Sequence, residues 1–125
     1  HSIFKILAEN SLVLARLNLN NGEYEILKRD YRLHGRGLEL EHDFESYNRR
    51  ILDEKLIHPD DEERYRARIT LSSLHNFFFD GKKQLSYQFC RQLNNKYIHT
   101  VMEFFAGNRC DVQNPWIVVL IREIS

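Results

Sequence analysis

The grouping of the strand candidates limits the fold more than any other feature, because two of them precede a central helical region and three follow it. Residues 12–19 are strand-like, with Val13, Ala15, Leu17 and Leu19 on one face. The turn Asn20-Asn21-Gly22 then leads into a second strand candidate at residues 23–29. Asn and Gly accept the positive φ angles of tight hairpin turns, so we predict a β-hairpin over residues 12–29.

Two helices are predicted in the centre of the chain, after an irregular stretch at residues 30–42. Asp43 is suited to cap the first helix, whose apolar positions have helical spacing: Phe44, Tyr47, Ile51 and Leu52. The second helix starts at the run His58-Pro59-Asp60-Asp61 and is expected to extend to about Leu74. We interpret this run as a helix start, where acids complement the helix dipole, rather than as an acid–base or metal cluster.

Three strands are predicted in the last third of the chain, at residues 85–93, 97–106 and 116–124. The last of them is apolar on both faces, whereas a sheet with one wet face should alternate. We therefore expect the second face to be covered as well. An amphipathic N-terminal helix at residues 2–9, or a second copy of the chain, would supply the cover, and the helix has four apolar positions on one side: Ile3, Phe4, Ile6 and Leu7.

The length of 125 residues fits one domain. We predict an α+β fold, in which a five-stranded antiparallel sheet carries helices on one face and an N-terminal helix. Residues 1–10 would form the helical cap and residues 11–125 the core. The chain begins at His1 rather than Met, so we expect it to be part of a longer protein.

Composition excludes some partners and gives no metal site. Lys+Arg and Asp+Glu are equal at 18 each, so a nucleic-acid groove is not expected. No apolar run reaches the length of a membrane span. The two cysteines, Cys90 and Cys110, do not make a disulfide framework and have no zinc-ligand spacing, which favours reduced thiols in a cytosolic domain.

Four short segments resemble the PAS family, in particular the members with an HPDD turn before the long helix. They are His58-Pro59-Asp60-Asp61, Tyr87-Gln88-Phe89-Cys90-Arg91, Tyr97-Ile98-His99 and the acid–Ile–hydroxyl end Arg122-Glu123-Ile124-Ser125. Two positions depart from the family pattern. Asn94-Asn95 stands where an Asp-Gly turn is usual, and His99 stands where a Trp is expected.

The resemblance implies a non-catalytic input module of a bacterial signal-transduction protein, which senses a ligand or dimerises. Such modules commonly regulate a C-terminal GGDEF diguanylate cyclase or a histidine kinase. We expect a cytoplasmic domain, whether or not the parent protein is anchored in a membrane, and a homodimer formed through the N-terminal helix and the sheet face. The binding or docking event would shift the packing of sheet and helices, and the last strand would transmit the shift.

PAS geometry also implies where an unidentified small molecule would bind, namely between the sheet and the central helices. On this basis the expected lining residues are Tyr65, Ile69, Phe89 and Met102. An interior filled by these same side chains is the alternative, because protein cores pack densely.

Three other functions stay open beside this one: a sensor loaded with haem or flavin, a small enzyme, and a purely structural dimerisation domain. A haem-loaded sensor would use a helix histidine, for which His75 is the candidate. A flavin photosensor would need a helical Cys motif, whereas Cys90 falls on a strand. For a small enzyme, the sequence offers neither a nucleophile motif nor a phosphate-binding loop. A purely structural dimerisation domain would have a filled interior. We therefore predict no catalytic residue, no metal and no cofactor.

Overall fold

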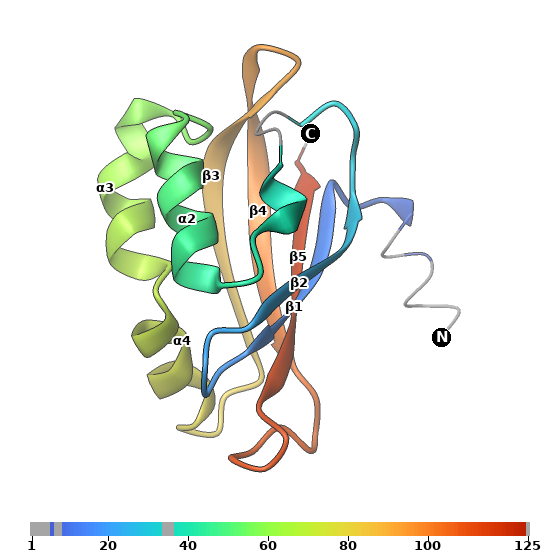
Figure 1. Cartoon of the computed structure of the whole chain (residues 1–125), viewed down its shortest axis with the longest axis vertical. Coiled ribbons are helices and arrows are strands. Elements are labelled where there is room, and N and C mark those ends of the chain that lie inside the picture. Colours follow the sequence, from blue (N-terminus) through green and yellow to red (C-terminus); the bar gives the residue numbers. More distant parts are fainter. Residues whose placement is uncertain (1–5, 7–8, 34–36, 125) are drawn as a thin grey trace.

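The computed structural model describes residue 6, residues 9–33 and residues 37–124. Figure 1 shows a sheet with helices packed on one side of it. In chain order the elements are β1 (Val13–Asn18), β2 (Tyr24–Arg29), a 3₁₀ turn η1 (Leu38–Leu40), α2 (Phe44–Asp53), α3 (Pro59–Arg68), α4 (Leu71–Phe78), β3 (Gln84–Leu93), β4 (Lys96–Ala106) and β5 (Trp116–Glu123).

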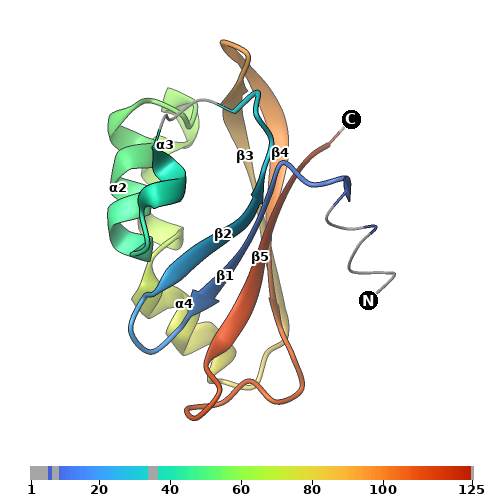
Figure 2. The same cartoon turned by 45° about the vertical axis from the view of Figure 1, so that its right-hand side comes forward.

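The sheet is antiparallel throughout and its strand order is β2-β1-β5-β4-β3. The opening hairpin therefore lies beside the last strand, and the three helices lie across a single face of the sheet (Figures 1 and 2). This confirms the predicted α+β class and the five antiparallel strands. The arrangement is consistent with a PAS-like fold.

The first hairpin is closed by the predicted turn. The backbone N–H of Gly22 donates to the carbonyl oxygen of Asn18 at 2.9 Å, and Gly22 has a φ of 80°. A β-carbon at Gly22 would lie 3.2 Å from the Leu71 side chain, which would have to shift slightly, so both the backbone φ and the tight space disfavour larger residues. The Asn94-Asn95 turn between β3 and β4 likewise has positive φ at both residues, 50° and 64°.

Side-chain caps begin all three helices. Asp43 accepts a hydrogen bond from the backbone N–H of Ser46 at 3.0 Å, as predicted for α2. His58 caps α3 by accepting from the N–H of Asp60 at 3.0 Å, and Pro59 is the first helical residue. The run at residues 58–61 is therefore a helix start, as the sequence indicated.

One helix boundary was predicted wrongly. The expected single helix up to Leu74 is two helices, because α3 ends at Arg68 and α4 begins at Leu71. Thr70 is extended and its hydroxyl accepts from the N–H of Ser73 at 3.1 Å, so it caps a new helix and ends the old one. Threonine competes for the backbone in this way because its short side chain bonds nearby N–H groups.

The sheet buries apolar side chains on both faces. The face toward the helices carries most of the core, including Val13, Phe104 and Val119. On the face turned away from the helices, the outer face, three side chains are buried as well: Leu14, Val101 and Leu120. The prediction that the second face is apolar too is confirmed for these positions.

The predicted N-terminal helix lies largely outside the described residues, which include none of Ile3, Phe4 and Leu7. Ile6 is described, and its side chain is 57% exposed, so Ile6 does not cover the sheet within a single chain. Its predicted role in a dimer stays a prediction. Among the described helices, none has both the length and the apolar character that crossing a membrane requires.

Candidate binding site between the sheet and the helices

Five polar side chains meet inside the layer between the sheet and the helices, and we call them the polar centre. They come from four elements: Tyr24 from β2, Tyr47 and Asn48 from α2, Tyr65 from α3, and Arg91 from β3. All five are buried, although three are phenols, one is an amide and one carries a full charge. Buried polar groups normally have hydrogen-bond partners, so the partners of each of the five side chains are described in turn.

Arg91 is held inside by the alternation of β3. Its neighbours at every second position, Phe89 and Leu93, are buried on the face toward the helices, and Ile98 lies opposite it on β4. The side chain of Arg91 is only 3% exposed. Arginine is almost never this deeply buried unless it is paired.

Within the described residues, the guanidinium of Arg91 has one hydrogen-bond partner. Its Nη2 donates a 3.3 Å hydrogen bond to the hydroxyl of Tyr47. Of the acidic side chains in the described residues, none forms an ion pair with Arg91. Burial disfavours the charged form, but the neighbouring phenols Tyr47 and Tyr65 outweigh burial, so the pKa of Arg91 is raised. The guanidinium thus stays charged at neutral pH without an opposite charge beside it.

The hydroxyl of Tyr24 is fully buried and has no hydrogen-bond partner among the described residues. Its ring lies 4.7 Å from that of Tyr47, centroid to centroid, and 5.4 Å from that of Phe44. Burial, followed by the neighbouring phenols, raises the pKa of Tyr24 well above its ordinary value. The phenol therefore keeps its proton at physiological pH, and in the described part of the chain this proton has no well-placed acceptor.

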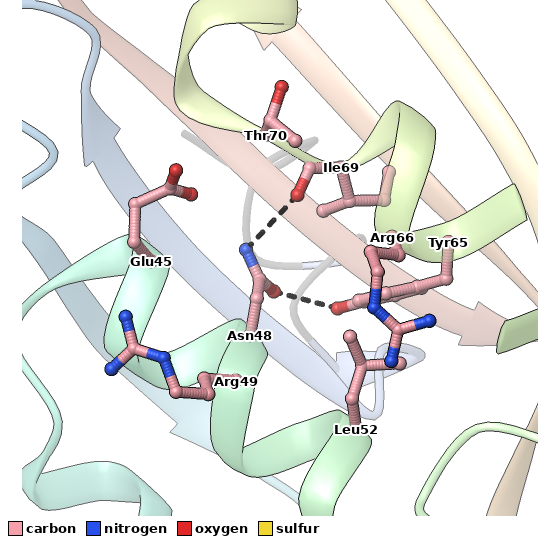
Figure 3. Close-up of a pocket in the computed structure, with 8 residues that line it drawn as sticks. All are labelled: Glu45, Asn48, Arg49, Leu52, Tyr65, Arg66, Ile69 and Thr70. Carbon is pink, nitrogen blue, oxygen red and sulfur yellow. Dashed lines mark hydrogen bonds between the residues drawn. The ribbon is translucent and has the colours of Figure 1, made fainter. Parts of the chain in front are cut away.

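Tyr65 and Asn48 form the best-satisfied part of the polar centre. The Tyr65 hydroxyl donates to the side-chain oxygen of Asn48 at 2.8 Å, and the Asn48 amide donates to the carbonyl oxygen of Ile69 at 3.5 Å. Figure 3 shows both bonds at the junction of α2 with the α3–α4 corner. Burial raises the pKa of Tyr65 as well.

A surface hollow of about 220 Å³ opens onto this pair. It is bounded by α2 on one side and by the end of α3 on the other (Figure 3). Its lining residues are Glu45, Asn48, Arg49, Leu52, Tyr65, Arg66, Ile69 and Thr70. The hollow thus places solvent on one side of Tyr65, while Arg91 is close enough to Tyr65 to influence its pKa.

The structure places all four residues that the sequence suggested as pocket lining in one core cluster: Tyr65, Ile69, Phe89 and Met102. The rings of Tyr65 and Phe89 meet edge to face at 5.0 Å between centroids. Tyr65 and Ile69 also line the hollow of Figure 3. Met102 lies on β4, opposite Tyr87 on one side and Ile121 on the other. That a ligand contacts these residues stays a prediction.

Sequence reasoning missed the other members of the polar centre, namely Tyr24, Tyr47, Asn48 and Arg91, as possible site residues. One signal was present for Arg91, since it shares the strand parity of Phe89 and Leu93. Another was present for Tyr47, which lies on the apolar side of α2. No local pattern distinguishes a buried arginine from an exposed one, so parity alone would have had to override the usual preference of arginine for solvent.

A second group of reactive side chains lies at the exposed side of β3 and β4. Cys90 Sγ lies 3.4 Å from Nδ1 of His99, and the backbone N–H of Cys90 donates to Asp61 at 2.7 Å. Burial, and then the charge of Asp61, raise the pKa of the Cys90 thiol. A reactive cysteine needs a lowered pKa, so this arrangement does not make a nucleophile.

His75, the candidate haem ligand, is half-buried on α4. Its ring packs against Phe79 at 4.3 Å between centroids, and it lines a different open hollow near the first hairpin, together with Leu19 and Asn20. His75 is therefore not part of the hollow beside the polar centre. No group of three or more His, Cys, Asp or Glu side chains suited to a metal ion occurs among residues 6, 9–33 and 37–124.

Comparison with models of known protein families gives no match for this chain, and comparison with curated proteins also gives none.

Proposed function

We propose that this chain is a PAS-type input module of a bacterial signal-transduction protein, which binds a small molecule in its helix-covered layer and has no catalytic activity of its own. The strand order with its central β5, the helices on one face and the helix start at residues 58–61 support this proposal. The parent protein would carry a diguanylate cyclase or histidine kinase output. In this reading the domain itself lies in the cytoplasm.

The observation that carries the proposal is the polar centre. Burying a guanidinium without a counter-ion destabilises a fold by several kcal/mol, on the order of the whole stability of a domain. A domain whose interior served only packing would place an apolar side chain at position 91. An interior that receives a polar ligand accounts for Arg91 and for the unpartnered hydroxyl of Tyr24.

The position of β5 suggests how binding would be transmitted. β5 lies in the middle of the sheet, between β1 and β4, and β4 pairs with the strand that carries Arg91. The backbone N–H of Ile124, just beyond β5, donates to the carbonyl oxygen of His99 on β4 at 3.0 Å. A shift of β3 and β4 on binding would therefore reach the C-terminal end of the domain.

A structural dimerisation domain is the second candidate, favoured by half-buried apolar side chains on the outer face, Phe105, Trp116 and Val118. We propose a homodimer through this face in either case. Sedimentation velocity over a range of concentrations tests the dimer. A sedimentation coefficient of a monomer at every concentration would contradict it.

The sensory function is tested by a melting-temperature screen of the purified chain against metabolites of several chemical classes. A specific ligand raises the melting temperature by mass action, whereas a filled structural domain responds to none of them. An absorbance scan of the same sample separates the cofactor-loaded alternatives. Visible bands of haem or flavin would replace this proposal with a chromophore sensor.

A further inference from the structure

The polar centre has an excess of hydrogen-bond donors over acceptors. A guanidinium has five N–H groups, and one of those of Arg91 is used, in the bond to Tyr47. The Tyr47 hydroxyl accepts that bond, and it donates to no acceptor in the part of the chain that the structure describes. The buried Tyr24 hydroxyl makes no hydrogen bond of good geometry there, although the Tyr47 hydroxyl is near enough to raise its pKa. The arrangement lacks an acceptor with several lone pairs.

The missing acceptor is also expected to carry negative charge. Arg91 is the one charged member of the polar centre, and the phenols of Tyr24 and Tyr65 hold their protons at neutral pH because burial raises their pKa. A group with one negative charge therefore neutralises the site. A phosphate dianion would leave one charge uncompensated in a buried position.

We propose that Arg91, Tyr24 and Tyr47 bind the carboxylate of a small monocarboxylic acid with an apolar body. The carboxylate accepts two parallel N–H bonds from the planar guanidinium, the arrangement that arginine favours, and further bonds from the two phenol hydroxyls. This proposal rests on the proposed sensory function and names the chemical class of its ligand.

The surroundings of Arg91 fit the apolar body of such an acid. Phe89 and Leu93 flank Arg91 on the same face of β3, and Ile98 lies opposite. Tyr65 packs on Phe89 and borders the hollow of Figure 3, where two arginines, Arg49 and Arg66, lie at the surface. The acid enters from this hollow by parting Tyr65 from Asn48. Arg49 and Arg66 outweigh Glu45 among the lining residues, and this excess of positive charge favours the approach of an anion.

The test is isothermal titration of the chain with four acids, acetate, isobutyrate, isovalerate and benzoate, each beside its uncharged amide, and with inorganic phosphate. We expect at least one acid to bind, its amide to bind at least about tenfold more weakly, and phosphate not to bind. Equal affinity for an acid and its amide would overturn the proposal, and so would binding of phosphate in place of every acid.

Two substitutions locate the site. Arg91→Met, which keeps length and removes the charge, should abolish binding of the acid, and Tyr24→Phe should weaken it about tenfold. Arg68→Met, at an exposed position near the end of α3, is the matched control and should bind as the parent chain does. An Arg91→Met chain that binds the acid normally would show that the site lies elsewhere.

The melting temperature of the empty chain distinguishes a binding role of Arg91 from a structural one. Replacing an unpaired buried charge by an apolar side chain of similar size is neutral or stabilising, so Arg91→Met should melt at the same or a higher temperature. A melting temperature well below that of the parent chain would overturn the binding role. Should Arg91→Met not fold, that result itself contradicts the proposal, and Tyr24→Phe gives an independent answer on affinity.

The experiment separates failure of the ligand class from failure of the sensory function. If none of the four acids binds but another class of metabolite raises the melting temperature, the carboxylate proposal is wrong and the sensory function stands. If no compound of any class binds, both are overturned.

Discussion

The hydroxyl of Tyr65 on α3 donates a 2.8 Å hydrogen bond to the side-chain oxygen of Asn48 on α2, inside the protein. This bond joins the two helices directly, beside the longer bond from the Asn48 amide to the carbonyl oxygen of Ile69. It also stands between the surface hollow and the rest of the polar centre, so it links the stability of the helical layer to access from solvent.

We predict that Tyr65→Phe destabilises the chain by about 1–3 kcal/mol, because the Asn48 oxygen loses its partner while it remains buried. Urea denaturation measures the free energy of unfolding. The double variant Asn48→Leu/Tyr65→Phe lacks both polar partners. Its loss of unfolding free energy should be smaller than the sum of the losses in Asn48→Leu and Tyr65→Phe alone. Strict additivity would mean that the bond is not formed in solution.

Tyr24→Phe should change the free energy of unfolding in the opposite direction to Tyr65→Phe. The Tyr24 hydroxyl is buried without a partner, so its removal relieves a desolvation penalty and leaves no new unpaired group. We expect the free energy of unfolding of the empty chain to stay equal or to rise by up to about 1 kcal/mol. A loss of more than about 1 kcal/mol would show that this hydroxyl has a partner in solution.

The edge of the sheet at β3 depends on the start of α3. Asp61 accepts a 2.7 Å hydrogen bond from the backbone N–H of Cys90, and the N–H of His58 donates to the carbonyl oxygen of Cys90 at 2.9 Å. The exposed edge of a sheet is a site of aggregation unless it is covered, and these contacts cover it. The residues at 58–61 therefore start α3 and also cover the edge of the sheet at β3.

We predict that Asp61→Ala exposes the amide of Cys90 and increases its hydrogen-exchange rate, because that N–H loses its only acceptor among the described residues. The neighbouring Asp60→Ala is a matched control, since Asp60 is also in the first turn of α3 but makes no bond to β3. Hydrogen exchange read by NMR at single amides measures the effect. Equal protection of Cys90 in both variants would contradict the assignment.

Acid sensitivity should arise in part at Asp30. Its carboxylate accepts two bonds from Arg32, at 2.9 and 2.8 Å, and chiefly for this reason its pKa falls from 3.8 to about 2. A carboxyl whose pKa is lower in the folded state than in the unfolded state stabilises the fold at pH values above its unfolded-state pKa. This stabilisation is lost as the pH falls through its folded-state pKa. The contribution of Asp30 is therefore complete above about pH 4 and lost toward pH 2.

Asp30→Asn should reduce the free energy of unfolding near pH 7 by at most about 1 kcal/mol, since the pair is close to solvent and screened. Asparagine keeps an acceptor for the Arg32 backbone N–H, so the change isolates the charge. The difference from the parent chain should shrink between about pH 4 and pH 2. A difference that is independent of pH would mean that charge is not the cause.

The fold was largely predictable because its determinants are local. Gly22 and the pair Asn94-Asn95 have the positive φ angles that their residue types indicate. Asp43 caps α2 as its spacing from the apolar positions indicated. The break between α3 and α4 was missed because Thr70 caps through a single hydroxyl bond, and the surrounding sequence keeps helix-compatible residues on both sides.

The polar centre was not predictable in the same way, because it is assembled by the tertiary structure. Arg91 and Tyr24 are far apart in sequence and lie on strands at opposite sides of the sheet, β3 and β2. Strand parity places each of them toward the helices, but it does not tell whether a buried arginine meets a carboxylate. Only the three-dimensional structure shows that Arg91 contacts phenol groups instead of a carboxylate.

The most direct test of the account follows the Arg91 side chain itself by NMR. Because this guanidinium is shielded from solvent, its Nε–H signal should be visible at neutral pH, and its absence in Arg91→Met assigns it. Addition of a binding acid, such as isovalerate, should move this signal strongly, while isovaleramide should leave it in place. A signal that does not move with any of the four acids, or that moves equally with acid and amide, would contradict an anion site at Arg91.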